Sequence, residues 1–199
     1  MKPLKIFLFI LLFSVYSVKG QLENSQWYFG NAAGLSFLTS PPTVLTNGAL
    51  GNSEGMASIA DAAGNLLFYT NGIDVFNSTH TLMANGSGLI GHMSSTQSGI
   101  IVKQPGNSNF YYVFTTNGYT HSYSIVDMSL AAGLGSVTVK NASLHVGSSE
   151  RQVAIRHCNG RDAWIVSHEY GTNNFRAYLL TENGLNLVPV ITSIGDVHI

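Results

Sequence analysis

Apolar residues along this chain occur in short runs that turn-forming residues interrupt. After the first 20 residues, runs rich in Val, Ile, Phe, Tyr, Thr and Trp are bounded by Gly, Asn, Asp, Ser and Pro about every ten residues, and helical periodicity is nearly absent. Runs of this composition and spacing are typical of β-strands. The pattern therefore predicts an all-β fold.

Three segments share one internal plan, in which a strand, a polar turn, a longer apolar strand and a further strand follow one another. The turn glycines Gly64, Gly106 and Gly160 are 42 and 54 residues apart, which is about the length of a propeller blade. The predicted strands are 56–60, 66–70 and 73–76; then 98–103, 110–115 and 121–126; and finally 152–156, 162–168 and 174–181.

The central strand of each segment is apolar without alternation, at 66–69, 110–114 and 163–166. Such a strand needs apolar cover on both faces, as a middle blade strand has between neighbouring blades. We predict a partial β-propeller of about three four-stranded antiparallel blades plus an N-terminal strand segment, not closed into a ring. A two-sheet sandwich is the alternative.

Composition changes along the chain predict its division into parts. Residues 130–150 and 183–199 are expected to be linkers, and no closing strand is expected at the end, so the chain is interpreted as the N-terminal piece or a truncated copy of a longer propeller. The predicted parts are a signal peptide (1–20), an N-terminal strand and loop segment (21–51) and three blade-like modules (52–94, 95–147 and 148–199).

The first residues predict the cellular location of the protein. Lys2 and Lys5 precede an apolar run at 6–18, which is too short to cross a membrane as a helix but typical of a secretory signal peptide. No later apolar stretch approaches the length of a membrane span. We therefore expect a secreted or cell-surface protein without a membrane span in its mature chain.

Charge and cysteine content exclude several classes. The chain has 45% hydrophobic and 10% charged residues, which excludes an extended disordered chain. Nine basic and ten acidic residues form no basic stripe, so no nucleic-acid partner is expected. Cys158 is the only cysteine, so neither an internal disulfide nor a cysteine-rich zinc site is expected, and it is interpreted as a buried small hydrophobe.

Two strings match catalytic or cofactor motifs but lack their context. Residues 51–55 read Gly-Asn-Ser-Glu-Gly, like a nucleophile elbow, yet no helix is expected after them. Residues 86–91 match a dinucleotide fingerprint, yet they precede a strand outside any βαβ unit. We therefore predict no catalytic residue from these motifs and no cofactor.

Polar residues that bear chemistry are scattered. No histidine pair has the spacing of a metal site, so no metal is predicted. Arg151, Arg156 and Arg161 are clustered enough to bind an anion, but they are interpreted as solvated or paired with neighbouring acids. The candidate ligand-binding residues, which would act only if the fold brings them together, are Glu54, Asp74, His157 and His168.

Several strings together resemble one family. They are Trp27–Gly30 with Ala33–Phe37, Glu54–Ala57 with Asp61–Thr70, Ser95–Ser98 with Gln104–Gly106, Tyr123–Leu130, and Arg156–Asp162 leading into Trp164–Glu169. This set resembles the N-terminal β-propeller region of large Bacteroidetes surface proteins that end in a gliding-motility-associated, type IX secretion sorting domain. The resemblance implies a WD40-like or YVTN-like propeller and supplies no catalytic residue. The chain departs from the family by stopping about halfway through the propeller, without a sorting domain.

These observations favour an exported, non-enzymatic binding or scaffold module that acts in adhesion, gliding or matrix interaction. Its expected partners are the remaining blades and domains of a longer protein, and a surface glycan or protein. The alternatives are a secreted propeller hydrolase acting on polysaccharide, and a truncated gene product without a separate function.

Overall fold

The protein is all-β. The computed structural model describes residues 21–51 and 54–198, so the predicted signal peptide at 1–20 lies outside the described residues. Within the described part there is no α-helix, only the short 3-10 turns η1 (Leu22–Asn24) and η2 (Ala131–Gly133). The strands form four separate antiparallel sheets, none of which closes on itself. The predicted all-β class is confirmed.

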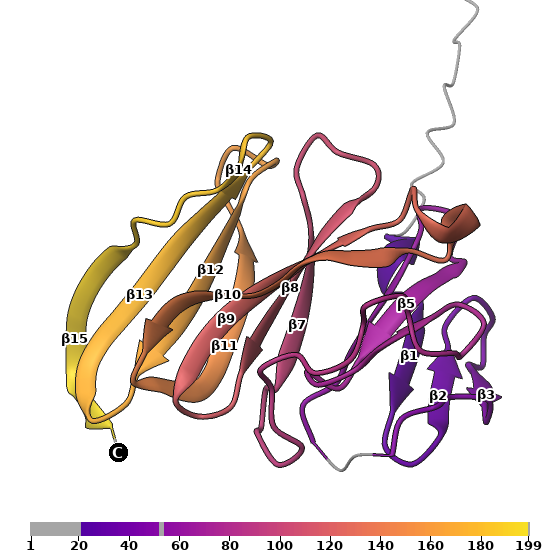
Figure 1. Cartoon of the computed structure of the whole chain (residues 1–199), viewed down its shortest axis with the longest axis horizontal. Helices are drawn as coiled ribbons and strands as arrows, with labels where there is room; N and C mark the ends of the chain where they lie inside the picture. The colour runs from indigo at the N-terminus through magenta and orange to yellow at the C-terminus, as the bar shows by residue number, and fades with distance from the viewer. Residues whose placement is uncertain (1–20, 52–53, 199) are drawn as a thin grey trace, which may run out of the picture.

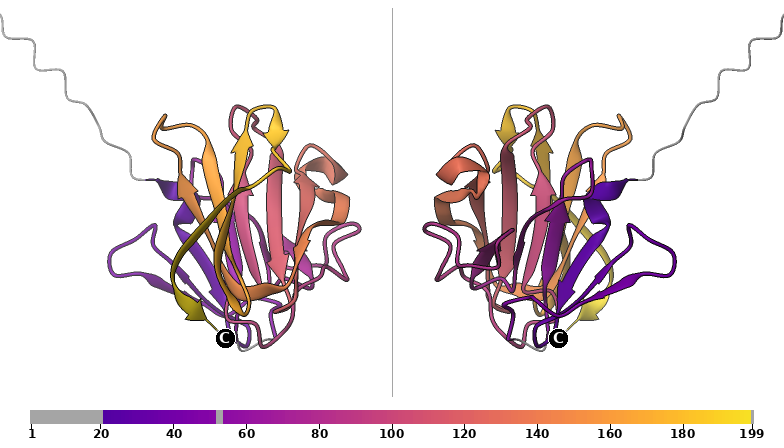
Figure 2. Two further views of the ribbon diagram at one scale, coloured as in Figure 1. Left: turned by 90° about the vertical axis from the view of Figure 1, so that its left-hand side faces the viewer. Right: turned by 90° about the vertical axis from the view of Figure 1, so that its right-hand side faces the viewer.

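Each sheet is built from one continuous stretch of chain, and the sheets stand side by side in chain order (Figure 1). Figure 2 looks along this row from its two ends. The first sheet contains β1 (Gln26–Phe29), β2 (Ala33–Ser36) and β3 (Thr43–Leu45), and the second contains β4 (Ala57–Ala60), β5 (Leu66–Thr70) and β6 (Val75–Asn77). The third contains β7 (Gly99–Lys103), β8 (Phe110–Thr116), β9 (Thr120–Asp127) and β10 (Ser136–Val146), and the fourth contains β11 (Ser148–Arg156), β12 (Ala163–Glu169), β13 (Thr172–Thr181), β14 (Gly184–Leu185) and β15 (Val190–His198).

Apolar side chains fill the space between successive sheets. Tyr28 of the first sheet stacks on Tyr69 of the second, with ring centroids 4.8 Å apart. Phe68 of the second sheet meets Tyr111 of the third edge to face at 5.6 Å. Phe114 of the third sheet packs in one cluster with Ile165 and Tyr178 of the fourth. Successive residues of β8 therefore pack against different neighbours, which explains why its sequence does not alternate between apolar and polar.

The numbers of strands differ from the expected three groups of four. The sheets have three, three, four and five strands, and the N-terminal segment forms a sheet of its own. In the second sheet the segment after β6 is irregular but still bonds to it, because Met83 N–H donates to Val75 O and Val75 N–H donates to Gly86 O, both at 2.8 Å. The segment after β6 therefore forms an edge of the second sheet without a regular ladder of backbone hydrogen bonds.

Both segments expected to be linkers contain strands. β10 lies within 130–150, and β15 lies within 183–199 and pairs with β13. The pairing of β10 with β9 is interrupted by three register shifts, which destroy the two-residue alternation that identifies a strand in sequence. β15 was also missed, because it is polar at Thr192 and Ser193 and carries Gly195, and it pairs within the fourth sheet without closing a ring.

Two side chains expected in the interior are not there. Cys158 is exposed in the turn between β11 and β12, so its reading as a buried hydrophobe was wrong. Trp164 is only partly buried, on the face of the fourth sheet that points away from the third, where its ring lies 5.7 Å from that of His157. The fourth sheet therefore has apolar residues on both faces but is covered on one.

The seam between the third and fourth sheets also contains two histidines, of which His121 is fully buried and His145 is half-buried. The His121 and His145 rings meet edge to face at 5.2 Å. Burial, followed by the charge interaction between the two rings, lowers the pKa of His121 to about 4. Burial, followed by the nearby Arg176 charge, lowers the pKa of His145 to about 4. Both rings are therefore neutral at neutral pH.

Replacing Phe114 with Ala tests the seam between the third and fourth sheets. Phe114 is fully buried, and loss of its ring leaves a cavity, so we expect the free energy of unfolding to fall by about 3 to 5 kcal/mol. Trp164→Ala, on the uncovered face of the fourth sheet, is the control and should cost less. Urea denaturation measures both values, and equal losses would contradict the assignment of the two faces.

The two histidines of the seam predict that acid begins to weaken the fold at a pH above the range in which carboxylates titrate. Unfolding restores their pKa from about 4 toward 6.5, so the unfolded chain binds more protons between these values. The free energy of unfolding should therefore fall on the order of 1 kcal/mol per pH unit from about pH 6.5 to about pH 4. Thermal melts between pH 7.5 and 4.5 (roughly the span in which His titrates) measure this slope, and no change in stability over that range would contradict it.

Candidate functional site

The first strand of each sheet borders a common hollow. A cavity of about 690 Å³ is lined by the segment around η1 and by residues of β4, β7 and β11. A second cavity of about 490 Å³ is lined by β1, β4, β7 and β11. The two share Asn24, Ile59, Ile101 and Ala154, and we call this continuous hollow the trough.

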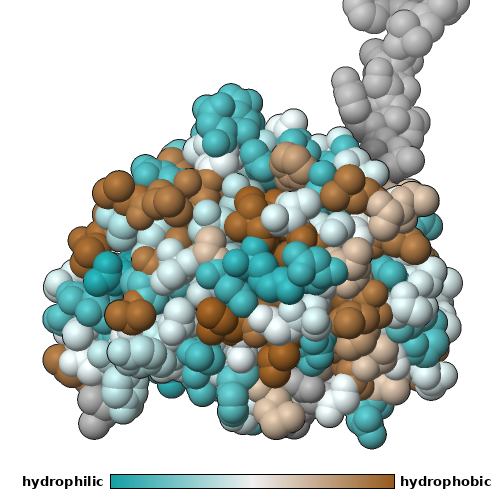
Figure 3. Space-filling model, viewed as in Figure 1, coloured by the Kyte–Doolittle hydropathy of each residue, from teal (hydrophilic) through white to brown (hydrophobic). Residues whose placement is uncertain are grey.

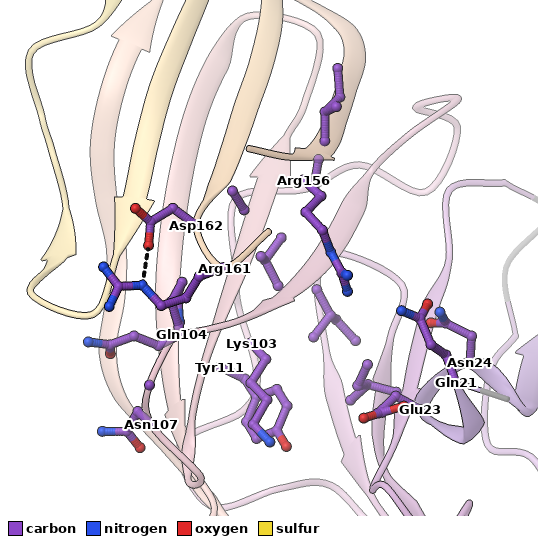
Figure 4. Close-up of a pocket in the computed structure, with 18 of the residues that line it drawn as sticks. Gln21, Glu23, Asn24, Lys103, Gln104, Asn107, Tyr111, Arg156, Arg161 and Asp162 are labelled. Carbon is purple, nitrogen blue, oxygen red and sulfur yellow. Dashed lines mark hydrogen bonds and ion pairs between the residues drawn. The ribbon is translucent and has the colours of Figure 1, made fainter. Parts of the chain in front are cut away.

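One end of the trough is polar. Figure 4 shows Arg156 reaching into the larger cavity, with Lys103 on one side and Glu23 and Asn24 of the N-terminal segment on the other. Side-chain amides that line the same cavity belong to Gln21, Asn24, Gln104 and Asn107. Ile59, Ile101 and Ala154 add apolar side chains to the lining of the same cavity. The arrangement combines cations, amides and apolar contact area.

Two cations at this end have no counter-ion within the described chain. Lys103 ends β7 and Arg156 ends β11, and both residues line the larger cavity. Neither the Lys103 ammonium nor the Arg156 guanidinium forms a hydrogen bond or ion pair with a described residue, although Lys103 Nζ lies 5.8 Å from the centre of the Tyr111 ring. Both charges are therefore available to an incoming group.

The third cation of the polar end is already paired. Arg161 Nε lies 3.2 Å from Asp162 Oδ1, and its Nη1 lies 3.1 Å from Glu182 Oε2. Asn159 Nδ2 donates to Asp162 Oδ2 at 2.7 Å, and this hydrogen bond, more than the Arg161 contact, lowers the pKa of Asp162. Asp162 therefore stays ionised and does not serve as a proton donor near neutral pH. Of the three arginines interpreted as solvated or paired with neighbouring acids, Arg161 is the one that pairs with Asp162.

The other end of the trough is apolar. Trp27, Phe29 and Met56 line the second cavity, and Trp27 is 51% exposed. The indole is held in place because its Nε1 donates to Asn24 O at 2.9 Å and its ring meets Phe37 edge to face at 5.0 Å. The sequence interpretation did not select this tryptophan.

The four candidate ligand-binding residues do not line the trough. Glu54 is exposed in the loop before β4, and Asp74 lies in the β5–β6 turn, where its backbone N–H donates to Asn71 Oδ1 at 2.7 Å. His157 lies in the β11–β12 turn, and its Nδ1 accepts from Asn159 N–H at 3.1 Å. His168 is buried in β12, where its Nε2 lies 3.0 Å from Thr172 O. The four candidate residues belong to four different loops, turns and strands.

Lys103 and Arg156 are the site residues that the sequence interpretation missed. Lys103 was not considered, and Arg156 was grouped with neighbouring surface arginines. A signal was present, because each is the last residue of the first predicted strand of its module, at 98–103 and 152–156. First strands of successive sheets border the trough, so corresponding positions converge there.

Comparison of the chain with protein-family models, with curated proteins and with solved structures found no match. Among residues 21–51 and 54–198, no helix is long and apolar enough to cross a membrane. Over the same residues, no group of three or more His, Cys, Asp or Glu side chains is placed to hold a metal ion.

Proposed function

We propose that this chain is an arc of an open β-propeller that serves as an exported, non-enzymatic binding module at a bacterial cell surface. We propose further that its trough binds a glycan bearing carboxylates. The observation that carries the proposal is the pair of cations without an ion-pair partner in the described chain, Lys103 and Arg156, which line one cavity together with amide and apolar side chains.

The order and packing of the sheets support the propeller part of the proposal. Four antiparallel sheets follow one another in chain order, each packs on the next, and their first strands border one hollow. Propeller blades have this relation to each other and to a central channel.

The two outer faces of the row support completion of the ring by further blades. The first sheet exposes Val44, and the fourth exposes Val190. Apolar side chains reach the surface at the fourth-sheet end in Figure 3. Uncovered apolar faces of this kind mark contact sites, and we propose that further blades cover them.

The chemistry of the trough supports an acidic glycan as ligand. Guanidinium and ammonium groups bind carboxylates through charge-assisted hydrogen bonds. Amide side chains exchange hydrogen bonds with sugar hydroxyls, and the exposed Trp27 ring offers a flat apolar surface to the C–H faces of a sugar. A ligand with carboxylates, hydroxyls and apolar ring faces matches all three.

Binding is favoured over hydrolysis by the state of Asp162. A glycosidase needs a protonated carboxyl group beside an ionised one. Asp162, which lines the larger cavity, has a lowered pKa and is held by Asn159 and Arg161. Asp162 is therefore ionised near neutral pH and lacks the proton that a general acid must donate.

Titration with alginate, a polymer of uronic acids, tests the ligand proposal. We expect alginate to bind the full chain, and Arg156→Gln and Lys103→Gln each to weaken the dissociation constant by about tenfold or more, because each removes a charge-assisted hydrogen bond. Isothermal titration calorimetry measures the constants, and added salt should weaken binding.

Arg151→Gln is the matched control. Arg151 lies on the same strand and carries the same charge, but it lines neither cavity of the trough. The control should bind alginate like the unaltered chain. The proposal fails if all three variants bind equally, or if uncharged dextran binds as tightly as alginate.

The export proposal rests on residues 1–20 and on the family resemblance, and is tested separately. Leu12→Arg places a charge in the apolar run of the proposed signal peptide. In a bacterial host we expect the unaltered chain to be exported and shortened, and the variant to stay inside at full length. Immunoblots of cell fractions decide this, and equal export of both chains would overturn the proposal.

A further inference from the structure

The seam between the third and fourth sheets contains a compact group of polar side chains. Ile165 and Tyr178 face the third sheet. Ser167 and Arg176 lie two residues along the same strands and face the same way, and they are direct partners across β12 and β13. His121 and His145 face them from β9 and β10, and His145 Nδ1 lies 3.1 Å from the Tyr178 hydroxyl. The four side chains therefore converge on one region.

Each of these four side chains has a buried polar atom without a partner in the described chain. The atoms are His121 Nδ1, His145 Nε2, Ser167 Oγ and Arg176 Nε. A buried polar atom without a hydrogen bond costs about 1–3 kcal/mol. Four such atoms in one seam indicate a missing hydrogen-bonding partner rather than four separate defects.

The hydrogen-bonding role of His121 is fixed by its neighbour Gln152. The Gln152 Nε2 group lies 2.8 Å from Gln97 O and 3.3 Å from Phe114 O. Carbonyl oxygens only accept, so this end of the amide is the NH₂ group, and Oε1 is the atom 3.1 Å from His121 Nε2. His121 must therefore donate through Nε2–H, and in its neutral form Nδ1 is an acceptor.

The missing partner must both donate and accept. It donates to His121 Nδ1, whereas Arg176 Nε carries a hydrogen and needs an acceptor. We infer that the seam is a binding site for ordered water, with a water molecule that donates to His121 Nδ1 and further bonds shared among Ser167, His145 and Arg176. The assignment concerns the fold alone and is independent of the proposed glycan site.

Charge in the seam excludes a simple ion as occupant. The charged and titratable groups that face the site are His121 and Tyr123 of β9, His145 of β10, Glu169 of β12, and Arg176 and Tyr178 of β13. Arg176 Nη2 pairs with Glu169 Oε2 at 3.1 Å, so the cluster is neutral while both imidazoles are neutral. A cation cannot accept from Arg176 Nε–H, and a halide cannot donate to His121 Nδ1.

The water site supports the strand that forms one wall of the trough. Gln152 belongs to β11, and its backbone N–H donates to Gln97 Oε1 at 2.8 Å, while its side chain joins β8 and β9. A donor to His121 Nδ1 holds the ring in the orientation that bonds Gln152. The water thus connects the interior of the seam to the position of β11.

A high-resolution crystal structure of the full chain tests the inference directly. We expect ordered water density at hydrogen-bond distance from His121 Nδ1, about 2.7–3.2 Å, and from at least one of the other three atoms. A seam closed around His121 Nδ1 without density, or an anomalous signal from an ion at that position, would overturn the inference.

Histidine ¹⁵N NMR supplies a test in solution. At neutral pH we expect His121 to show Nε2–H and an imine Nδ1 signal shifted upfield, as for a nitrogen that accepts a hydrogen bond. Ser167→Val fills the site with methyl groups and should move the Nδ1 signal toward the value of a free imine. Thr115→Val is the matched control, because Thr115 Oγ1 is also a buried unpaired hydroxyl but lies on the other face of the third sheet. A protonated Nδ1 or a free-imine signal in the unaltered chain, or equal shifts in the two variants, would contradict the inference.

Discussion

The structure depends on the burial of apolar sheet faces against one another. A single three- or four-stranded meander cannot cover both of its faces, so each sheet is stable only beside a neighbour. β8 shows this constraint most clearly, because Tyr111 and Val113 pack toward the second sheet while Tyr112 and Phe114 pack toward the fourth. The same packing sets the first strands around one hollow and so creates the trough.

The elements that were predictable from sequence carry local signals. Asp61 illustrates this, because its Oδ1 accepts from the backbone N–H groups of Ala63 and Asn65 at 2.8 and 2.9 Å, forming the turn that its sequence predicts. The middle strand of each predicted module was equally easy to predict, since it is an unbroken apolar run. β10 and β15 were not predicted, because these edge strands are partly polar and their pairing is interrupted by register shifts.

The sites were less predictable than the strands. Lys103 and Arg156 are 53 residues apart and become a pair only because their strands border the same hollow. The role of His121 depends on a chain of bonds through Gln152 to Gln97 and Phe114, which no local pattern encodes. Glu54 and Asp74 were selected by residue type alone, and their surroundings explain them as loop and turn residues. A site that depends on tertiary contacts cannot be predicted from a local sequence pattern.

Hydrogen–deuterium exchange of the full chain, resolved by strand, tests the packing account most directly. If each sheet is held by its neighbours, the amides of β5, β8 and β12 exchange slowest, and β8, covered on both faces, is the slowest of all. Exchange of β8 as fast as that of the edge strands β3 and β15 would show that the sheets do not depend on one another, and would contradict the account.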